Sequence, residues 1–144
     1  MGPSGGGKST LLDILADRKR SGILIGSVLI NQRPRSPLFS RESAYVLQDD
    51  VHIAELTVAE TIMYSVWTRM PEGTSTEDIQ ERVRVLLELL GLIHIKDSRV
   101  GSALVKGISG GQKKRLSIAE SLAALPSLVF LDGKCNVVCC HAAD

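Results

Sequence analysis

Residues 2–10 read Gly-Pro-Ser-Gly-Gly-Gly-Lys-Ser-Thr, which matches the pattern G-x-x-x-x-G-K-[ST] of a phosphate-binding loop. Glycines permit the tight turn in which several backbone N–H groups converge on an anion. Lys8 is expected to reach the β- and γ-phosphates of a nucleotide, and the Ser9 hydroxyl to hold Mg²⁺. The residues predicted to hold the phosphates are Gly5, Gly6, Gly7, Lys8, Ser9 and Thr10.

The apolar run at residues 11–20 is predicted to form a helix whose N-terminus faces the phosphates. Arg18, Lys19 and Arg20 would lie in its last turn, and Gly22 would end it. Only Met1 precedes the loop, whereas the motif normally follows a buried strand of about five residues. We therefore expect that strand to be missing or truncated.

Composition excludes several classes of function. The 144 residues suffice for one domain with a core, and 17 basic against 16 acidic residues leave a net charge of +1. With aromatic residues at only 3%, nothing indicates a nucleic-acid partner. No apolar stretch reaches the ~18 residues of a membrane span, and no signal peptide is recognisable. We expect a cytosol-side polypeptide, soluble as it stands.

Further along, short strands are predicted at residues 27–30 and 43–47, with a turn at Asn31-Gln32 and a loop at residues 33–37. A capping box at Thr57 and Glu60 predicts a helix to about Met70. Helices at about 77–90 and from Ser109 to before residue 126 follow, and then a strand at 127–132. The apolar stripe of the helix at 77–90 is Ile79, Val83, Leu86, Leu87 and Leu90. This order describes an α/β core with a helical insertion at about 55–125.

Polar residues stand at the ends of these elements. Gln48 ends an apolar strand, where its amide could touch Mg²⁺ and the attacking water, and Asp132 ends the last strand as an acid that holds Mg²⁺. The run Ser109-Gly110-Gly111-Gln112 opens a helix and forms a second candidate anion site. For that run alone, an ordinary capped helix is the alternative.

Together these motifs resemble the nucleotide-binding domain of ATP-binding-cassette transporters. The Ser-Gly-Gly-Gln run is similar to that family's signature motif, Gln48 to its Q-loop and residues 128–132 to its Walker B strand. Residues 48–50, 56–61, 69–71 and 113–119 resemble the eukaryotic G subfamily of eye-pigment, sterol and multidrug half-transporters. The resemblance covers residues 1–132.

The resemblance implies a P-loop NTPase fold: an α/β core, a helical signature-motif subdomain and, in this chain, an incomplete parallel sheet. Residues 1–132 would be a partial nucleotide-binding domain, truncated at both ends, that binds ATP and Mg²⁺ and drives transport. Two such domains pair head to tail, so Ser109, Gly110, Gly111 and Gln112 would contact the partner's nucleotide. Ser9, Gln48 and Asp132 would surround Mg²⁺, with Gln48 and Asp132 as the catalytic positions. The transmembrane domain lies outside this sequence and would place the domain at the cytosolic face of a membrane.

After Asp132 the sequence departs from the family pattern. Gly133 stands where the family has the glutamate that polarises the attacking water, and loss of a general base typically costs about 10²–10⁴-fold in rate. Residues 133–144 read as an aberrant tail, for which read-through into an intron and a truncated gene model are the two hypotheses. Its Cys135, Cys139 and Cys140 match no common zinc spacing. Missing strands would leave apolar surface on Leu11, Leu128 and Phe130 without cover.

Alternatives remain open from the sequence. Gly133 favours a non-catalytic fragment that binds ATP or pairs with a full-length partner but does not turn over. DNA-maintenance ATPases also carry a Ser-Gly-Gly-Gln signature, but they insert a long coiled coil, and about 100 residues without sustained heptads separate the two motifs here. His52, His94 and His141 are expected to be surface or loop residues.

Overall fold

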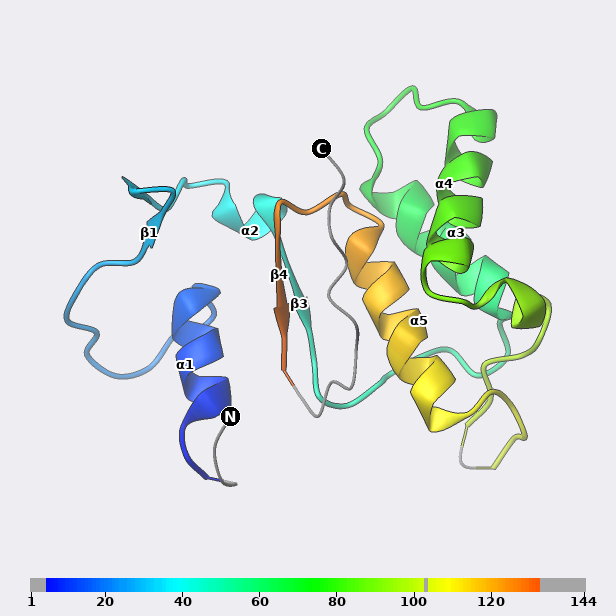
Figure 1. Ribbon diagram of the computed structural model, residues 1–144, viewed down its shortest axis with the longest axis horizontal. Helices are drawn as coiled ribbons and strands as arrows, with labels where there is room; N and C mark the ends of the chain where they lie inside the picture. The colour runs from blue at the N-terminus through cyan, green and yellow to red at the C-terminus, as the bar shows by residue number, and fades with distance from the viewer. Residues whose placement is uncertain (1–4, 103, 133–144) are drawn as a thin grey trace.

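The computed structural model describes residues 5–102 and 104–132. Its elements in chain order are α1 (Lys8–Leu15), β1 (Leu29–Ile30), β2 (Arg33–Pro34), α2 (Phe39–Glu42), β3 (Ser43–Val46), α3 (Val58–Arg69), α4 (Thr76–Leu89), the 3-10 helix η1 (Ile93–Ile95), α5 (Gly110–Leu122) and β4 (Leu128–Leu131). Figure 1 shows β3 and β4 side by side, with α1 on one side and α5, α3 and α4 on the other. Within the described part of the chain, no helix combines the length and apolarity that crossing a bilayer requires.

The parallel pairing of β3 with β4 forms the centre of this α/β fold. Tyr45 lies opposite Phe130 and Val46 opposite Leu131, and the Asp132 N–H extends the ladder by donating to the Val46 carbonyl at 3.0 Å. Because side chains alternate along a strand, Tyr45 and Phe130 face α1, whereas Val46 and its partner face the helices on the other side. The predicted strands at 43–47 and 127–132 are confirmed, and they pair in parallel as a two-stranded sheet.

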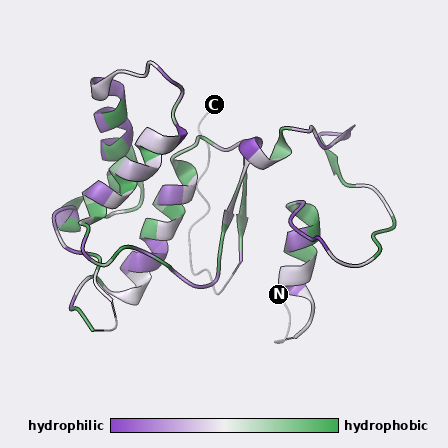
Figure 2. Ribbon diagram, turned by 180° about the vertical axis from the view of Figure 1, so that it is seen from behind, coloured by the Kyte–Doolittle hydropathy of each residue, from purple (hydrophilic) through white to green (hydrophobic). Residues whose placement is uncertain are grey.

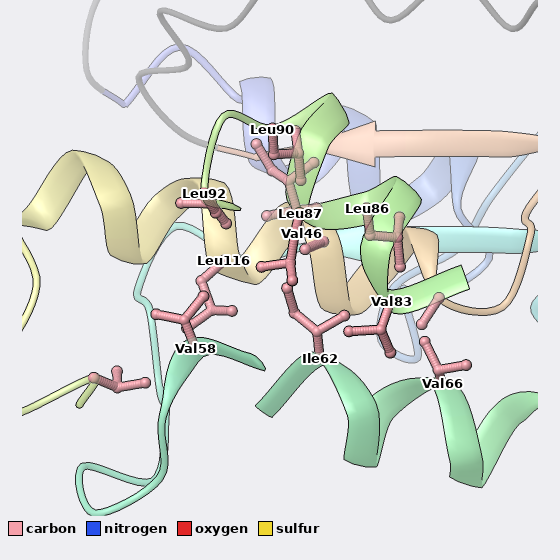
Figure 3. Packing of buried hydrophobic residues seen from close by; sticks show 14 residues of the cluster. Val46, Val58, Ile62, Val66, Val83, Leu86, Leu87, Leu90, Leu92 and Leu116 are labelled. Carbon is pink, nitrogen blue, oxygen red and sulfur yellow. The ribbon is translucent and has the colours of Figure 1, made fainter. Parts of the chain in front are cut away.

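The main core lies between the sheet and helices α3, α4 and α5. Ile62 of α3, Leu86 of α4 and Leu116 of α5 are fully buried and converge on Val46 (Figure 3). Hydrophobic and hydrophilic residues are mixed along each of these helices (Figure 2), as expected for helices with one face buried. The predicted stripe of the helix at 77–90 is confirmed as core packing.

The capping signals position the helices as predicted. Thr57 and Glu60 form a capping box: the Thr57 hydroxyl accepts from the Glu60 N–H at 3.2 Å, and the Glu60 carboxylate accepts from the Thr57 N–H at 2.8 Å. Ser75 caps α4 in a similar way through the Asp78 N–H. These side chains replace the partners that the first N–H groups of a helix lack.

The predicted extent of the first helix is wrong, because α1 ends at Leu15 and none of the basic residues lies in its last turn. Asp17 adopts a left-handed conformation with φ 58°, and the N–H groups of Asp17 and Arg18 donate to the carbonyls of Ile14 and Asp13. This is a Schellman cap, built on one of the few residue types other than glycine that tolerate the left-handed region. Arg35 secures it by donating to two helix carbonyls and pairing with Asp17 at 3.3 Å.

The loop predicted at residues 33–37 is also corrected. Arg33–Pro34 forms β2, which pairs antiparallel with β1. The predicted turn at Asn31 and Gln32 is confirmed, and both residues have positive φ, 49° and 64°. Positive φ at both central residues of a two-residue loop is typical of a type I′ hairpin turn, whose twist suits the two strands.

A smaller cluster covers the α1 face of the sheet. Phe39 from α2, an element that the sequence analysis did not predict, packs edge-on against Phe130, and Tyr45 stacks on the same ring. Phe130 is therefore buried, contrary to the expectation that it lacks cover. Leu11 and Leu128 remain 57% and 39% exposed, as predicted.

We predict that Ile62→Ala lowers the free energy of unfolding by about 2–5 kcal/mol, because it leaves a cavity at the centre of the main core. Met63→Ala, at the neighbouring exposed position, should change it by no more than about 0.5 kcal/mol. Urea denaturation followed by circular dichroism measures both. Equal effects of the two substitutions would contradict the assigned core.

Candidate functional site

The described part of the phosphate loop is an exposed turn that leads into α1. Gly5 and Gly7 have φ of 80° and 75°, in the left-handed region, and a Cβ added at either would meet no atom within 4 Å. Backbone conformation rather than space therefore requires glycine at these positions. Gly7 is the N-cap of α1, so the helix begins at Lys8 with its first N–H groups open to solvent.

Ser9 and Asp132, predicted from distant motifs, are brought together by the fold. The Ser9 hydroxyl donates to Asp132 Oδ1 at 2.8 Å, and the Tyr45 hydroxyl donates to Oδ2 of the same carboxylate at 3.1 Å. Hydroxyl and carboxylate oxygens are the hard ligands that Mg²⁺ prefers, usually one or two protein oxygens together with phosphate and water. This donor set fits Mg²⁺ bound with a nucleotide. Among the described residues, no group of three or more His, Cys, Asp or Glu forms an all-protein metal site.

Gln48 lies two residues beyond β3, at the same edge of the sheet as Asp132, because the carboxyl ends of parallel strands meet there. Its carbonyl accepts a hydrogen bond from Lys114 Nζ at 3.1 Å. Its side chain is exposed, and within the described residues its amide makes no hydrogen bond to Ser9 or Asp132. The structure therefore places Gln48 at the correct edge without joining it to the other predicted Mg²⁺ ligands.

The signature run forms the N-terminus of α5. Ser109 and Gln112 make a capping box, in which the Gln112 side chain accepts from the Ser109 N–H at 2.8 Å and the Ser109 hydroxyl accepts from the Gln112 N–H at 3.3 Å. Gly110 and Gly111 are exposed, with open space where a side chain would stand. The N-terminal ends of α1 and α5 lie toward the same end of the molecule, on opposite sides of the sheet (Figure 1).

Tyr45 is a site residue that the sequence analysis missed. Burial, together with hydrogen bonds and charges from Asp13 and Asp132, raises its pKa well above the ordinary range of tyrosine. Arg18 lies over the ring, 4.3 Å from its centroid. The hydroxyl thus stays protonated and donates to Asp132. The sequence signal that could have identified Tyr45 is its position in the predicted strand at 43–47, which ends close to Gln48.

A second polar cluster also escaped the sequence analysis. It joins the segment after β3 to α5, and we name it the Asp50 cluster. Its side chains are Asp50, His52, Lys114, Ser117 and Glu120. His52 lies in a loop, as expected, but its side chain is only 2% exposed. His94 is exposed as predicted, and His141 lies outside the described residues.

The comparisons with known proteins agree with these motifs. The ABC transporter family profile matches residues 1–136. The chain is 46% identical to the broad substrate specificity ATP-binding cassette transporter ABCG2 of Sus scrofa, over 92% of this chain and 20% of that protein. It is 45% identical to ABC transporter G family member 24 of Dictyostelium discoideum, over 100% and 12%, and 44% identical to ABC transporter G family member 49 of Oryza sativa subsp. japonica, over 92% and 9%.

An exposed glycine-rich turn before a helix, facing an acid at the end of a parallel strand, defines a P-loop nucleotide-binding fold. The chain belongs to the ABC transporter family, and its relatives are transporters of the G subfamily. This match favours the transporter class over the DNA-maintenance alternative. The chain spans 20% or less of the length of these three relatives. Gly133 and the predicted tail at 133–144, with its three cysteines, lie outside the described residues.

We predict that a spectrophotometric titration of the chain shows tyrosinate forming above pH ~10, the ordinary value for tyrosine. Tyr45→Phe should remove this late component, and Asp132→Asn should move it to lower pH, because less negative charge would oppose ionisation. The control is circular dichroism at each pH, to show that the fold persists. If the late component persists in Tyr45→Phe, its assignment to Tyr45 is contradicted.

Proposed function

We propose that this chain is the ATP-binding and ATP-hydrolysing motor domain of a G-type ABC transporter. The observation that carries the proposal is the contact between Ser9 and Asp132, which joins the phosphate loop to the acid after β4. Gly5, Gly7 and the open N-terminus of α1 stand beside it and suit a bound triphosphate.

Different residues of the chain would bind phosphate, hold Mg²⁺ and orient the Asp132 carboxylate at this site. The backbone N–H groups of residues 5–10 bind phosphate oxygens, and Lys8 contributes a positive charge to them. Ser9, Gln48 and Asp132 would hold Mg²⁺, which supplies neutralisation of phosphate charge when bound. Tyr45 orients the Asp132 carboxylate by donating to the oxygen that Ser9 does not occupy.

The signature run serves a second nucleotide in this proposal. Its location across the sheet from α1 supports contact with the ATP of a partner domain, either identical or different (Figure 1). The exposed Gly110 and Gly111 leave room for a close approach of phosphate to the backbone. Closing such a pair would drive a transmembrane domain outside this sequence, from the cytosolic face of a membrane.

We expect Lys8→Ala to weaken Mg·ATP binding at least about tenfold, since a charged hydrogen-bond donor to phosphate is lost. Lys96→Ala, at an exposed position after η1, is the matched control and should bind as the unmodified chain does. Titration calorimetry gives both affinities. Unchanged binding by Lys8→Ala would contradict the proposed site.

The Gly133→Glu substitution distinguishes two hypotheses: an ATP-hydrolysing motor domain and a non-catalytic fragment that only binds ATP. If the chain lacks only a general base, the substitution should raise ATP turnover by about 10²–10⁴-fold without tightening ATP binding. Phosphate release under saturating Mg·ATP measures turnover, and Gly133→Gln is the control because it adds bulk without a base. Equal rates for the Glu and Gln variants would favour the non-catalytic alternative.

A further inference from the structure

In the Asp50 cluster, one hydroxyl group and one ammonium group of α5 contact the Asp50 carboxylate. Ser117 Oγ donates to Asp50 Oδ1 at 2.6 Å, and Lys114 Nζ lies 3.3 Å from the same oxygen. Lys114 Nζ also donates to the carbonyls of Leu47 and Gln48. One carboxylate and two backbone carbonyls of the segment after β3 are therefore held by adjacent turns of one helix.

A histidine and a glutamate extend the cluster along α5. His52 Nδ1 lies 3.2 Å from Glu120 Oε2, and its Nε2 lies 3.2 Å from the Lys113 carbonyl and 3.1 Å from Ser117 Oγ. Both ring nitrogens thus face α5.

Partial burial makes these contacts stronger than exposed ion pairs. The side chains of Lys114 and Asp50 are 15% and 18% exposed, and that of Glu120 is 25% exposed. By contrast, Arg84 and its two glutamate partners on α4 are all at least 50% exposed, and ion pairs in such positions contribute little. Hydrogen bonds to partly buried charges are stronger, and costly to leave unmade.

We propose that the Asp50 cluster is a clamp that positions Gln48 by fixing the segment after β3 to the flank of the signature helix. Asp50, Lys114, Ser117, His52 and Glu120 are positioning residues: they hold the backbone on both sides of Gln48 and do not themselves touch nucleotide. This inference rests on the proposed function, since Gln48 matters only if ATP is turned over beside it.

The charge on His52 strengthens the clamp. Burial alone lowers the pKa of His52, but Glu120, the Lys113 carbonyl and Asp50 together raise it above 6.5. A raised pKa in the folded state means that the stabilisation is complete below 6.5 and is lost as the pH rises through the folded value. His52 is faced by Glu120 and the Lys113 carbonyl of α5 and by Asp50 of its own segment. Lys114 of α5 pairs with that Asp50, and Arg69 of α3 lines the same pocket as His52.

Backbone order in the full chain tests the clamp without nucleotide. We expect NMR order parameters at residues 48–52 of about 0.85 in the unmodified chain and about 0.6 or less in Ser117→Ala. Ser117→Thr, which restores the hydroxyl, should recover the high value. Ser121→Ala is the matched control, since Ser121 donates only to a carbonyl within α5. Order should also fall as pH rises through the His52 titration, and this dependence should disappear in His52→Gln.

Turnover supplies the functional readout. Ser117→Ala should lower kcat for ATP while leaving the affinity for Mg·ATP unchanged, because the phosphate loop is untouched. High order at residues 48–52 in both Ser117→Ala and Lys114→Met would overturn the clamp. Failure of Mg·ATP binding in the unmodified chain would overturn the proposed function instead, and the order parameters would still decide the clamp. Circular dichroism confirms that each variant keeps its helices.

Discussion

Two strands that pair in parallel cannot be joined by a tight turn, because the chain has to cross over the sheet before the second strand begins. In this chain the crossover between β3 and β4 contains α3, α4 and α5. The pairing makes neighbours of segments that are distant in sequence, and it brings both carboxyl ends to one edge. Gln48 and Asp132 follow those ends, so the candidate site exists only because β3 and β4 pair in this register.

The pleat of the same two strands separates the helices. Tyr45 and Phe130 pack toward α1, and Val46 and Leu131 toward the helical cluster. As a result two helix N-termini lie at the same end of the molecule but on opposite sides of the sheet (Figure 1). One of them adjoins Asp132 through Ser9. The other is capped by its own side chains and faces solvent, which suits a nucleotide held by another domain.

Sequence patterns predicted the features that depend on near neighbours. Thr57 and Ser109 mark helix starts by bonding three residues ahead, and the stripe of α4 follows helical periodicity. Features that depend on distant partners were missed. α1 ends early because Asp17 takes a left-handed conformation that Arg35 supports from another segment. His52 is buried because α5 packs over it, and no local pattern in its loop indicates that.

We propose that one chain binds nucleotide at the N-terminus of α1, whereas the N-terminus of α5 contacts the nucleotide of a partner domain. Amide chemical shifts recorded during a Mg·ATP titration of the dilute chain test this most directly. We expect shifts at residues 5–10 and at Asp132, and unchanged shifts at residues 109–112 until two domains pair. Shifts at 109–112 alone, or at both helix N-termini with one affinity in the monomer, would contradict it.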